Sequence, residues 1–197
     1  MVSKIVERAL CDVQSIIQRI LCAHFNGNPA TTIIVHYAPT EGSDGAEEHY
    51  VNLTNVINSI PKHNVTIVIG DCNAHIGKDS AKYTYHDKTN NHANLLLEMV
   101  EGTNMMITNT NFQKKCGKLW TYISDMSGTK SQIDYVLINQ KWKNSVKNVE
   151  AYSSFSSIGS DHRVVTARLK LSLRTGRSPP RRKAYEWGVL KSDKNLQ

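Results

Sequence analysis

The sequence lacks the long apolar runs that anchor a protein in a membrane. No stretch of its 197 residues approaches the roughly 20 consecutive apolar residues that a membrane-spanning helix needs. The first residues do not show the basic-then-apolar order of a secretory signal. An apolar share of 40% and a charged share of 21% are typical of a globular chain that buries a sizeable core. We therefore expect one domain, with no membrane partner, in the nucleus or the cytoplasm.

Cysteine is scarce and does not occur in closely spaced pairs. The chain contains only Cys11, Cys22, Cys72 and Cys116. Without CxxC spacing or a dense cysteine framework, the pattern disfavours zinc sites and disulfides and favours reduced thiols.

Acidic residues are scarce near the C-terminal end. The net charge is +7, and after Arg163 the many lysines and arginines are opposed only by Glu186 and Asp193. The composition of residues 174–183 is unsuited to a core, so we interpret residues 174–197 as a basic and flexible tail. By charge alone, binding of a polyanion and simple solubility are equally good explanations of this tail.

The spacing of apolar residues predicts alternating helices and strands. Residues 1–18 carry valine, leucine and isoleucine at three- and four-residue steps, which predicts an amphipathic helix. Strands separated by helices predict a mixed α/β or α+β sandwich. We expect further helices at 47–60 and 93–101, and strands at 31–37, at 65–69 and within "MMITNT", "LWTYIS", "QIDYVLI" and "VVTARLKLSL".

Three apolar segments end in, or carry, an acidic residue with a polar neighbour. Asp71 and Asn73 follow the strand "IVIG", Asp134 lies inside "QIDYVLI", and Asp161 and His162 precede the last strand. Each has an ordinary explanation when taken alone. Asp71 can cap a turn, Asp134 can face solvent, and His162 can be a surface imidazole.

Together, such groups have a chemical meaning. Carboxylates gathered at one edge of a sandwich repel one another and need a divalent cation or bound protons. Mg²⁺ accepts a few carboxylate oxygens and keeps positions for phosphate oxygens and water. A histidine beside a carboxylate supplies a general base near neutral pH. This set of groups therefore predicts hydrolysis of a phosphodiester.

Three motifs also resemble a known family. The segments "GDCNA", "QIDYVLI" and "SDHRVV" resemble, in this order, three signatures of the exonuclease–endonuclease–phosphatase superfamily. Residues 19–187 are similar in detail to the endonuclease domain of RTE-type non-LTR (LINE-like) retrotransposons, through "FNGNPATTIIVHYAPT", "KLWTYISDMSG" and "KWKNSVKNVEAYSSFSSIGSDHR". Sequences of this type are often labelled craniofacial-development-protein-like. The resemblance implies a four-layered α/β sandwich over residues 19–173, a DNA partner, and Mg²⁺, or alternatively Mn²⁺, as cofactor.

The resemblance implies catalytic roles for five residues. Tyr37 would touch the scissile phosphate. Asp71 would align or deprotonate the attacking water, and Asn73 would hold a phosphate oxygen. Asp134 would orient His162, which would bind the phosphate and act in acid–base chemistry.

The resemblance implies other roles for three further residues. Asp161 would lie at the metal, together with Asp71. Trp120 and Thr121 would belong to a loop near the nucleic acid, although core packing is an equally good explanation of Trp120.

The resemblance does not extend to the first residues. The family's opening strand with a metal-site Asn, and the next segment with a metal-ligating Glu, have no counterpart here. We therefore expect an N-terminally truncated sandwich, preceded by an unrelated helix at residues 1–18. A missing ligand would weaken metal binding. Missing strands would expose a sheet edge and favour self-association. Cys72 replaces the usual Phe, which predicts a loss of packing.

Three hypotheses remain open. The first is an apurinic-type, Mg²⁺-dependent DNA endonuclease of retrotransposon origin. The second is a catalytically impaired remnant that binds nucleic acid or protein. The third is a phosphoesterase acting on a small or lipid phosphate, which the fold allows but the basic tail does not favour.

Overall fold

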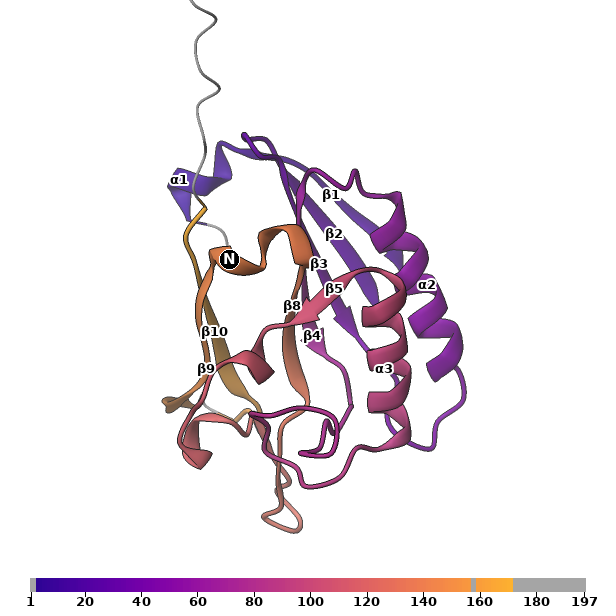
Figure 1. Cartoon of the computed structure of the whole chain (residues 1–197), viewed down its shortest axis with the longest axis vertical. Coiled ribbons are helices and arrows are strands. Elements are labelled where there is room, and N and C mark those ends of the chain that lie inside the picture. The colour runs from indigo at the N-terminus through magenta and orange to yellow at the C-terminus, as the bar shows by residue number, and fades with distance from the viewer. Residues whose placement is uncertain (1–2, 157–158, 172–197) are drawn as a thin grey trace, which may run out of the picture.

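A six-stranded mixed sheet forms the centre of the molecule (Figure 1). The computed structural model describes residues 3–156 and 159–171. The strand order is β1-β2-β3-β4-β8-β5, and all neighbours are antiparallel except β3 and β4, which are parallel. In sheet order these strands are Leu10–Ile17 (β1), Ile20–Phe25 (β2), Thr31–Tyr37 (β3), Val65–Asp71 (β4), Asp134–Asn139 (β8) and Met105–Ile107 (β5).

Two helices cover one face of this sheet. They are α2 (Ala46–Ser59) and α3 (Asn91–Gly102), which lie side by side in Figure 1. Helical spacing turns Tyr50 and Leu53 of α2, and Leu96 of α3, toward the sheet, where all three are buried. These helices and the sheet enclose the larger of two apolar clusters.

A second, two-stranded sheet packs near the opposite face of the large sheet. It consists of β9 (Val146–Ser156) and β10 (Arg163–Leu169), paired antiparallel. A smaller apolar cluster joins the two sheets through Val65, Val136, Ile138, Val146 and Val149. The helices, the large sheet and the small sheet are three successive layers. The predicted α/β sandwich is therefore confirmed, whereas the described residues form three layers and not the predicted four.

The remaining elements are short. None of the helices among the described residues is long and apolar enough to cross a membrane. The short elements are α1 (Lys4–Glu7), the hairpin of β6 (Tyr122–Ile123) and β7 (Lys130–Ser131), and three 3₁₀ helices, η1 (Asn109–Asn111), η2 (Cys116–Lys118) and η3 (Gln140–Ser145).

The helix predicted for residues 1–18 is wrong. Helix α1 is a single turn, and Leu10–Ile17 form strand β1, in which Val13 lies opposite Ala23 of β2. Valine and isoleucine at three- and four-residue steps can also occur in a strand, and their branched side chains favour the extended conformation. Because β1 is mostly exposed, its hairpin pairing with β2 decides its structure, not the burial of one helical face.

Most other predicted elements are confirmed. The predicted helices correspond to α2 and α3, the strands at 31–37 and 65–69 correspond to β3 and β4, and "QIDYVLI" contains β8. Strands β1, β2, β7 and β9 were not predicted. The boundary between residues 1–18 and 19–173 stays a prediction, and the predicted tail at 174–197 lies outside the described residues.

Part of the large sheet is exposed at its β1 edge. The side chains of Val13, Leu21 and Val35 are 51%, 38% and 41% exposed. Leu21 pairs with Val35 in the register of β2 and β3, so these two apolar side chains lie on the same face. Apolar side chains are therefore exposed on one face of the sheet near its end strand β1. An edge exposed by missing strands, and self-association through it, stay predictions.

Candidate active site

Three of the predicted site residues lie in one row across the large sheet. Tyr37 ends β3 and pairs with Asp71, which ends β4, and Asp71 pairs with Asp134, which begins β8. Because β3 and β4 are parallel, their carboxyl ends meet at one edge. The antiparallel strand β8 brings its first residue to the same edge.

Gly70 allows this close approach of strands immediately before Asp71. A Cβ atom at residue 70 would lie 1.9 Å from the carbonyl oxygen of His36 in β3. A larger residue would therefore displace the backbone that carries Asp71.

The chain turns sharply after Asp71. Oδ1 of Asp71 accepts the backbone N–H of Asn73 at 2.9 Å, and Asn73 has a φ of 46°, in the left-handed region that asparagine tolerates. The Asn73 side chain donates to the carbonyl of Ala38 at 2.8 Å. Asp71 thus caps a turn, as its ordinary explanation predicted, but this uses only one of its two oxygens.

Asp134 and His162 form a hydrogen-bonded pair. Nδ1 of His162 lies 3.0 Å from Oδ2 of Asp134, and Nε2 lies 4.0 Å from Oδ2 of Asp71. The hydrogen bond to Asp134 raises the pKa of His162 above its ordinary value, although partial burial opposes the rise. The pair therefore orients the imidazole with Nε2 toward Asp71.

The carboxyl group of Asp71 lies in an unfavourable place for a negative charge. Burial raises its pKa to about 6, and Asp134 and Asp161 add to the rise, while the Asn73 N–H and His162 oppose it. A bound cation would favour the ionised form of this group.

Five of the predicted site residues line one cleft of about 570 Å³. This volume is within the usual range of ligand sites. Asp134 does not line the cleft, but its carboxylate contacts Nδ1 of His162, which does. Their roles in catalysis and metal binding stay predictions. The predicted residues that line the cleft are Tyr37, Asp71, Asn73, Asp161 and His162.

The donors for a metal ion are incomplete in the described residues. No group of three or more His, Cys, Asp or Glu side chains in residues 3–156 and 159–171 is arranged to hold a metal ion. Asp71 and Asp161 do supply the oxygen donors that Mg²⁺ prefers, and proteins commonly hold Mg²⁺ by one or two carboxylates together with substrate phosphates and water. If a Mg²⁺ ion binds here, these two carboxylates would hold it only together with a phosphate substrate and water.

The structure places Trp120 and Thr121 differently from the prediction of nucleic-acid contact. Trp120 is 8% exposed, and its ring is covered by Arg163, whose guanidinium carbon lies 3.0 Å from the ring centroid. Thr121 is 1% exposed and is bonded to the backbone. Core packing, the alternative interpretation of Trp120, agrees with this burial, and the Thr121 side chain is not available to a ligand in this conformation.

Sequence reasoning missed several residues of the cleft. His75 lines it and stacks on His86, with 3.9 Å between ring centroids. Arg19 does not line the cleft but lies over the ring of the cleft residue Tyr37, with its guanidinium carbon 5.0 Å from the centroid. The position of His75 two residues after Asn73 was an available signal, whereas nothing in the sequence links Arg19 to Tyr37. The other cleft residues that were not predicted are Thr40, Glu41, Tyr122, Ser124, Ser127, Thr129, Ser131 and Ile133.

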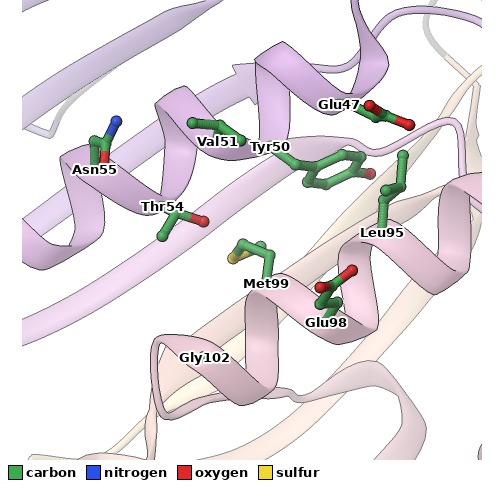
Figure 2. Close-up of a pocket in the computed structure, with 9 residues that line it drawn as sticks. All are labelled: Glu47, Tyr50, Val51, Thr54, Asn55, Leu95, Glu98, Met99 and Gly102. Atoms are coloured by element: carbon green, nitrogen blue, oxygen red, sulfur yellow. The ribbon is translucent and has the colours of Figure 1, made fainter.

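Tyr50 of helix α2 holds the turn that follows Asp71. Figure 2 shows Tyr50 projecting from α2 toward α3, into a pocket of about 480 Å³. Its hydroxyl donates to the carbonyl of Cys72 at 3.1 Å. This bond holds the residue between Asp71 and Asn73.

The chain is similar in sequence to two curated relatives. It is 30% identical to craniofacial development protein 2 of Bos taurus over 183 aligned residues, which cover 88% of this chain and 30% of that protein. It is 28% identical to the same protein of Tragulus javanicus, with coverage of 88% and 31%. The chain thus spans less than a third of the length of these relatives. No family model matches the sequence.

Solved structures share the fold at low sequence identity. The endonuclease domain of TRAS1, a telomere-specific non-LTR retrotransposon, superposes with a TM-score of 0.62 at 14% identity, covering 83% of this chain and 70% of that one. The 3′-5′ exonuclease NExo from Neisseria meningitidis gives 0.65 at 16% identity, with coverage of 82% and 72%. NExo described as a 3′ phosphatase, bound to a product DNA hairpin, gives 0.64. The chain therefore has the α/β sandwich fold of the exonuclease–endonuclease–phosphatase superfamily, and it is related in sequence to part of craniofacial development protein 2.

Proposed function

We propose that this chain hydrolyses phosphodiester bonds of DNA in the presence of Mg²⁺ or Mn²⁺, as an apurinic-type endonuclease of retrotransposon origin in the nucleus or cytoplasm. The observation that carries the proposal is the connected set Asp134–His162–Asp71, of which His162 and Asp71 line one cleft. The neighbours support DNA as the substrate, because one is a retrotransposon endonuclease domain and another is bound to a DNA hairpin.

The Asp134–His162 pair supplies the acid–base group in this mechanism. Asp134 accepts the hydrogen bond of Nδ1 and fixes the ring, so Nε2 is directed to the scissile phosphate. Because Asp134 raises the pKa of His162, a larger fraction of the imidazole carries a proton near neutral pH, which favours contact with an anionic phosphate oxygen.

The other cleft residues position the reactants. Asp71 aligns the attacking water through Oδ2, because Oδ1 is already used in the turn. The second N–H of the Asn73 amide and the Tyr37 hydroxyl hold phosphate oxygens at the edge where β3 and β4 end. Asp71 and Asp161 would hold the Mg²⁺ ion, which when bound supplies positive charge to the phosphate oxygens.

One observation favours a second function. Because no three ligating side chains converge in the described residues, this part of the chain can be a nucleic-acid- or protein-binding module that does not cleave DNA. Self-association through the exposed β1 edge is a further proposal, which rests on the exposure of Val13.

Nicking of supercoiled plasmid tests the main proposal. We expect the unaltered chain to nick plasmid in Mg²⁺ and not in EDTA, and His162→Ala to be slower by about 10²–10⁴-fold. His63→Ala is the matched control, because His63 is exposed and lies outside the cleft. Equal, metal-independent nicking by all three proteins would refute catalysis. Salt-dependent retention of His162→Ala on DNA, without nicking by any protein, would support the binding module instead.

A further inference from the structure

Thr121 lies at a junction of the strands that carry the site. Its side chain is 1% exposed, and it directly precedes β6. The hydroxyl oxygen accepts the backbone N–H groups of Ile133 and Asp134, each at 3.1 Å. A hydroxyl oxygen has two acceptor lone pairs, so these two bonds use its full acceptor capacity.

The first of these bonds connects Thr121 to the strand of Asp71. Ile133 donates its backbone N–H to Thr121, and its carbonyl, which is in the same peptide group as the N–H of Asp134, accepts the N–H of Cys72 at 2.8 Å. Cys72 follows Asp71 directly, so the position of the Ile133 peptide affects the end of β4 as well as the start of β8.

The backbone of Thr121 connects to β10, which begins directly after His162. Its carbonyl accepts the N–H of Arg163 at 2.7 Å. The Arg163 guanidinium stacks on Trp120 and donates to the carbonyl of Gly117 at 2.8 Å, which fixes the same segment from the other side. Thr121 thus contacts β8, which begins with Asp134, and β10, which begins directly after His162.

We propose that Thr121 is a positioning residue, whose hydroxyl sets the start of β8 so that Asp134 meets Nδ1 of His162. It does not touch the substrate, and its role differs from the nucleic-acid contact that the resemblance implies. The effect of Thr121 on catalysis rests on the proposed function, whereas its effect on the pair does not.

Two substitutions separate positioning from packing. Thr121→Val keeps the shape and removes the acceptor, so two buried N–H groups lose their partner. Thr121→Ser keeps the acceptor and removes a methyl group, which leaves a small void. If the hydroxyl positions Asp134, valine disrupts the pair and serine preserves it. If the side chain only fills space, the order is reversed.

The direct readout is the Nδ1 proton of His162, observed by NMR on the full metal-free chain. We expect its hydrogen-bonded, downfield resonance in the unaltered chain and in Thr121→Ser, and its loss in Thr121→Val. Thr108→Val is the matched control, since Thr108 is fully buried and its hydroxyl donates to Val136 in the same strand. That control should keep the resonance even if it lowers stability.

Kinetics give the second readout. In the plasmid assay, Thr121→Val should lower kcat by roughly 10–100-fold with little change in KM, because displaced catalytic groups slow the chemical step more than binding. Thr121→Ser should restore most of the rate.

If no protein nicks DNA, the proposed function fails but the NMR result still decides the positioning role. A resonance that persists in Thr121→Val, or disappears in a folded Thr121→Ser, would overturn the proposal. Should Thr121→Val not fold, the serine variant alone decides.

Discussion

At the scale of single residues, the site depends on side chains that serve structure and chemistry together. Asp71 caps its own turn with Oδ1 and faces His162 with Oδ2. Cys72 is fully buried between Asp71 and Asn73, and its carbonyl is held by Tyr50. The sequence motifs could predict that Asp71 and His162 belong to a site. They could not predict that Oδ1 of Asp71 caps the turn while Oδ2 faces His162. The different contacts of the two oxygens depend on the turn after Asp71 and on the register of strands that are distant in the sequence.

Gly70 gives a prediction at this scale. Replacement by alanine would place a Cβ atom 1.9 Å from the His36 carbonyl oxygen, so we expect Gly70→Ala to destabilise the fold by about 1–3 kcal/mol or more. Urea unfolding followed by circular dichroism measures the loss. Gly102→Ala is the control, because a Cβ there meets nothing within 4 Å. Equal stability of the two variants would show that β3 and β4 are not in this close contact.

At the scale of elements, buried histidines join β3 to α2. Nδ1 of His36 lies 3.2 Å from Nε2 of His49, and both side chains are buried. Burial lowers the pKa of His36 to about 3 and that of His49 to about 4, so both are neutral in the folded protein at pH 7. Burial lowers the pKa of His75 as well.

A pH dependence of stability follows from these histidines. Their pKa values are lower in the folded chain than in the unfolded chain, so their contribution is complete above pH 6.5 and is lost as the pH falls toward 4. We expect urea unfolding to show a loss of up to about 1.4 kcal/mol per pH unit for each histidine between pH 6.5 and 4.5. His162 has a raised pKa, so its contribution is complete below pH 6.5 and is lost only above it. Asp71, with a pKa raised to about 6, opposes the trend as the pH falls through 6, but it is one group against several. The slope should decrease in His49→Gln. A stability that stays constant over this range would contradict the buried, neutral pair.

Also at this scale, elements with strong local patterns could be predicted, and elements formed by pairing could not. In α2 and α3 the apolar residues recur at helical spacing and the helices cover a sheet face, so pattern and burial agree. In β1 most residues are exposed, so the sequence shows no alternation of buried and exposed side chains that would indicate a strand. Its valines and isoleucines instead recur at the spacing that is typical of a helix. The cleft was predictable where a polar residue follows an apolar strand, as at Asp71. The contact of Arg19 with Tyr37 and the hydrogen bonds of Thr121 to Ile133 and Asp134 were not predictable, because no sequence pattern links these residues to their partners.

At the scale of the whole molecule, apolar side chains of the large sheet are exposed, and no element among the described residues covers them. Val13 and Val35 are 51% and 41% exposed, and β1 ends the sheet. We expect sedimentation velocity to show concentration-dependent self-association that Val13→Lys reduces, because a lysine on an edge strand opposes pairing. Val51→Lys, at a 58% exposed position on α2, should have no effect. A single monomeric species at every concentration would contradict self-association.

The central claim is that Asp134 and His162, 28 residues apart in the chain, act as one catalytic unit on DNA. The most direct test is the rate of Mg²⁺-dependent plasmid nicking by Asp134→Asn, His162→Ala and the double variant. The account predicts that each single variant loses activity and that the double variant is hardly slower than His162→Ala alone, because residues of one unit have non-additive effects. Losses that multiply, or an unaltered chain that does not nick DNA in Mg²⁺, would contradict it.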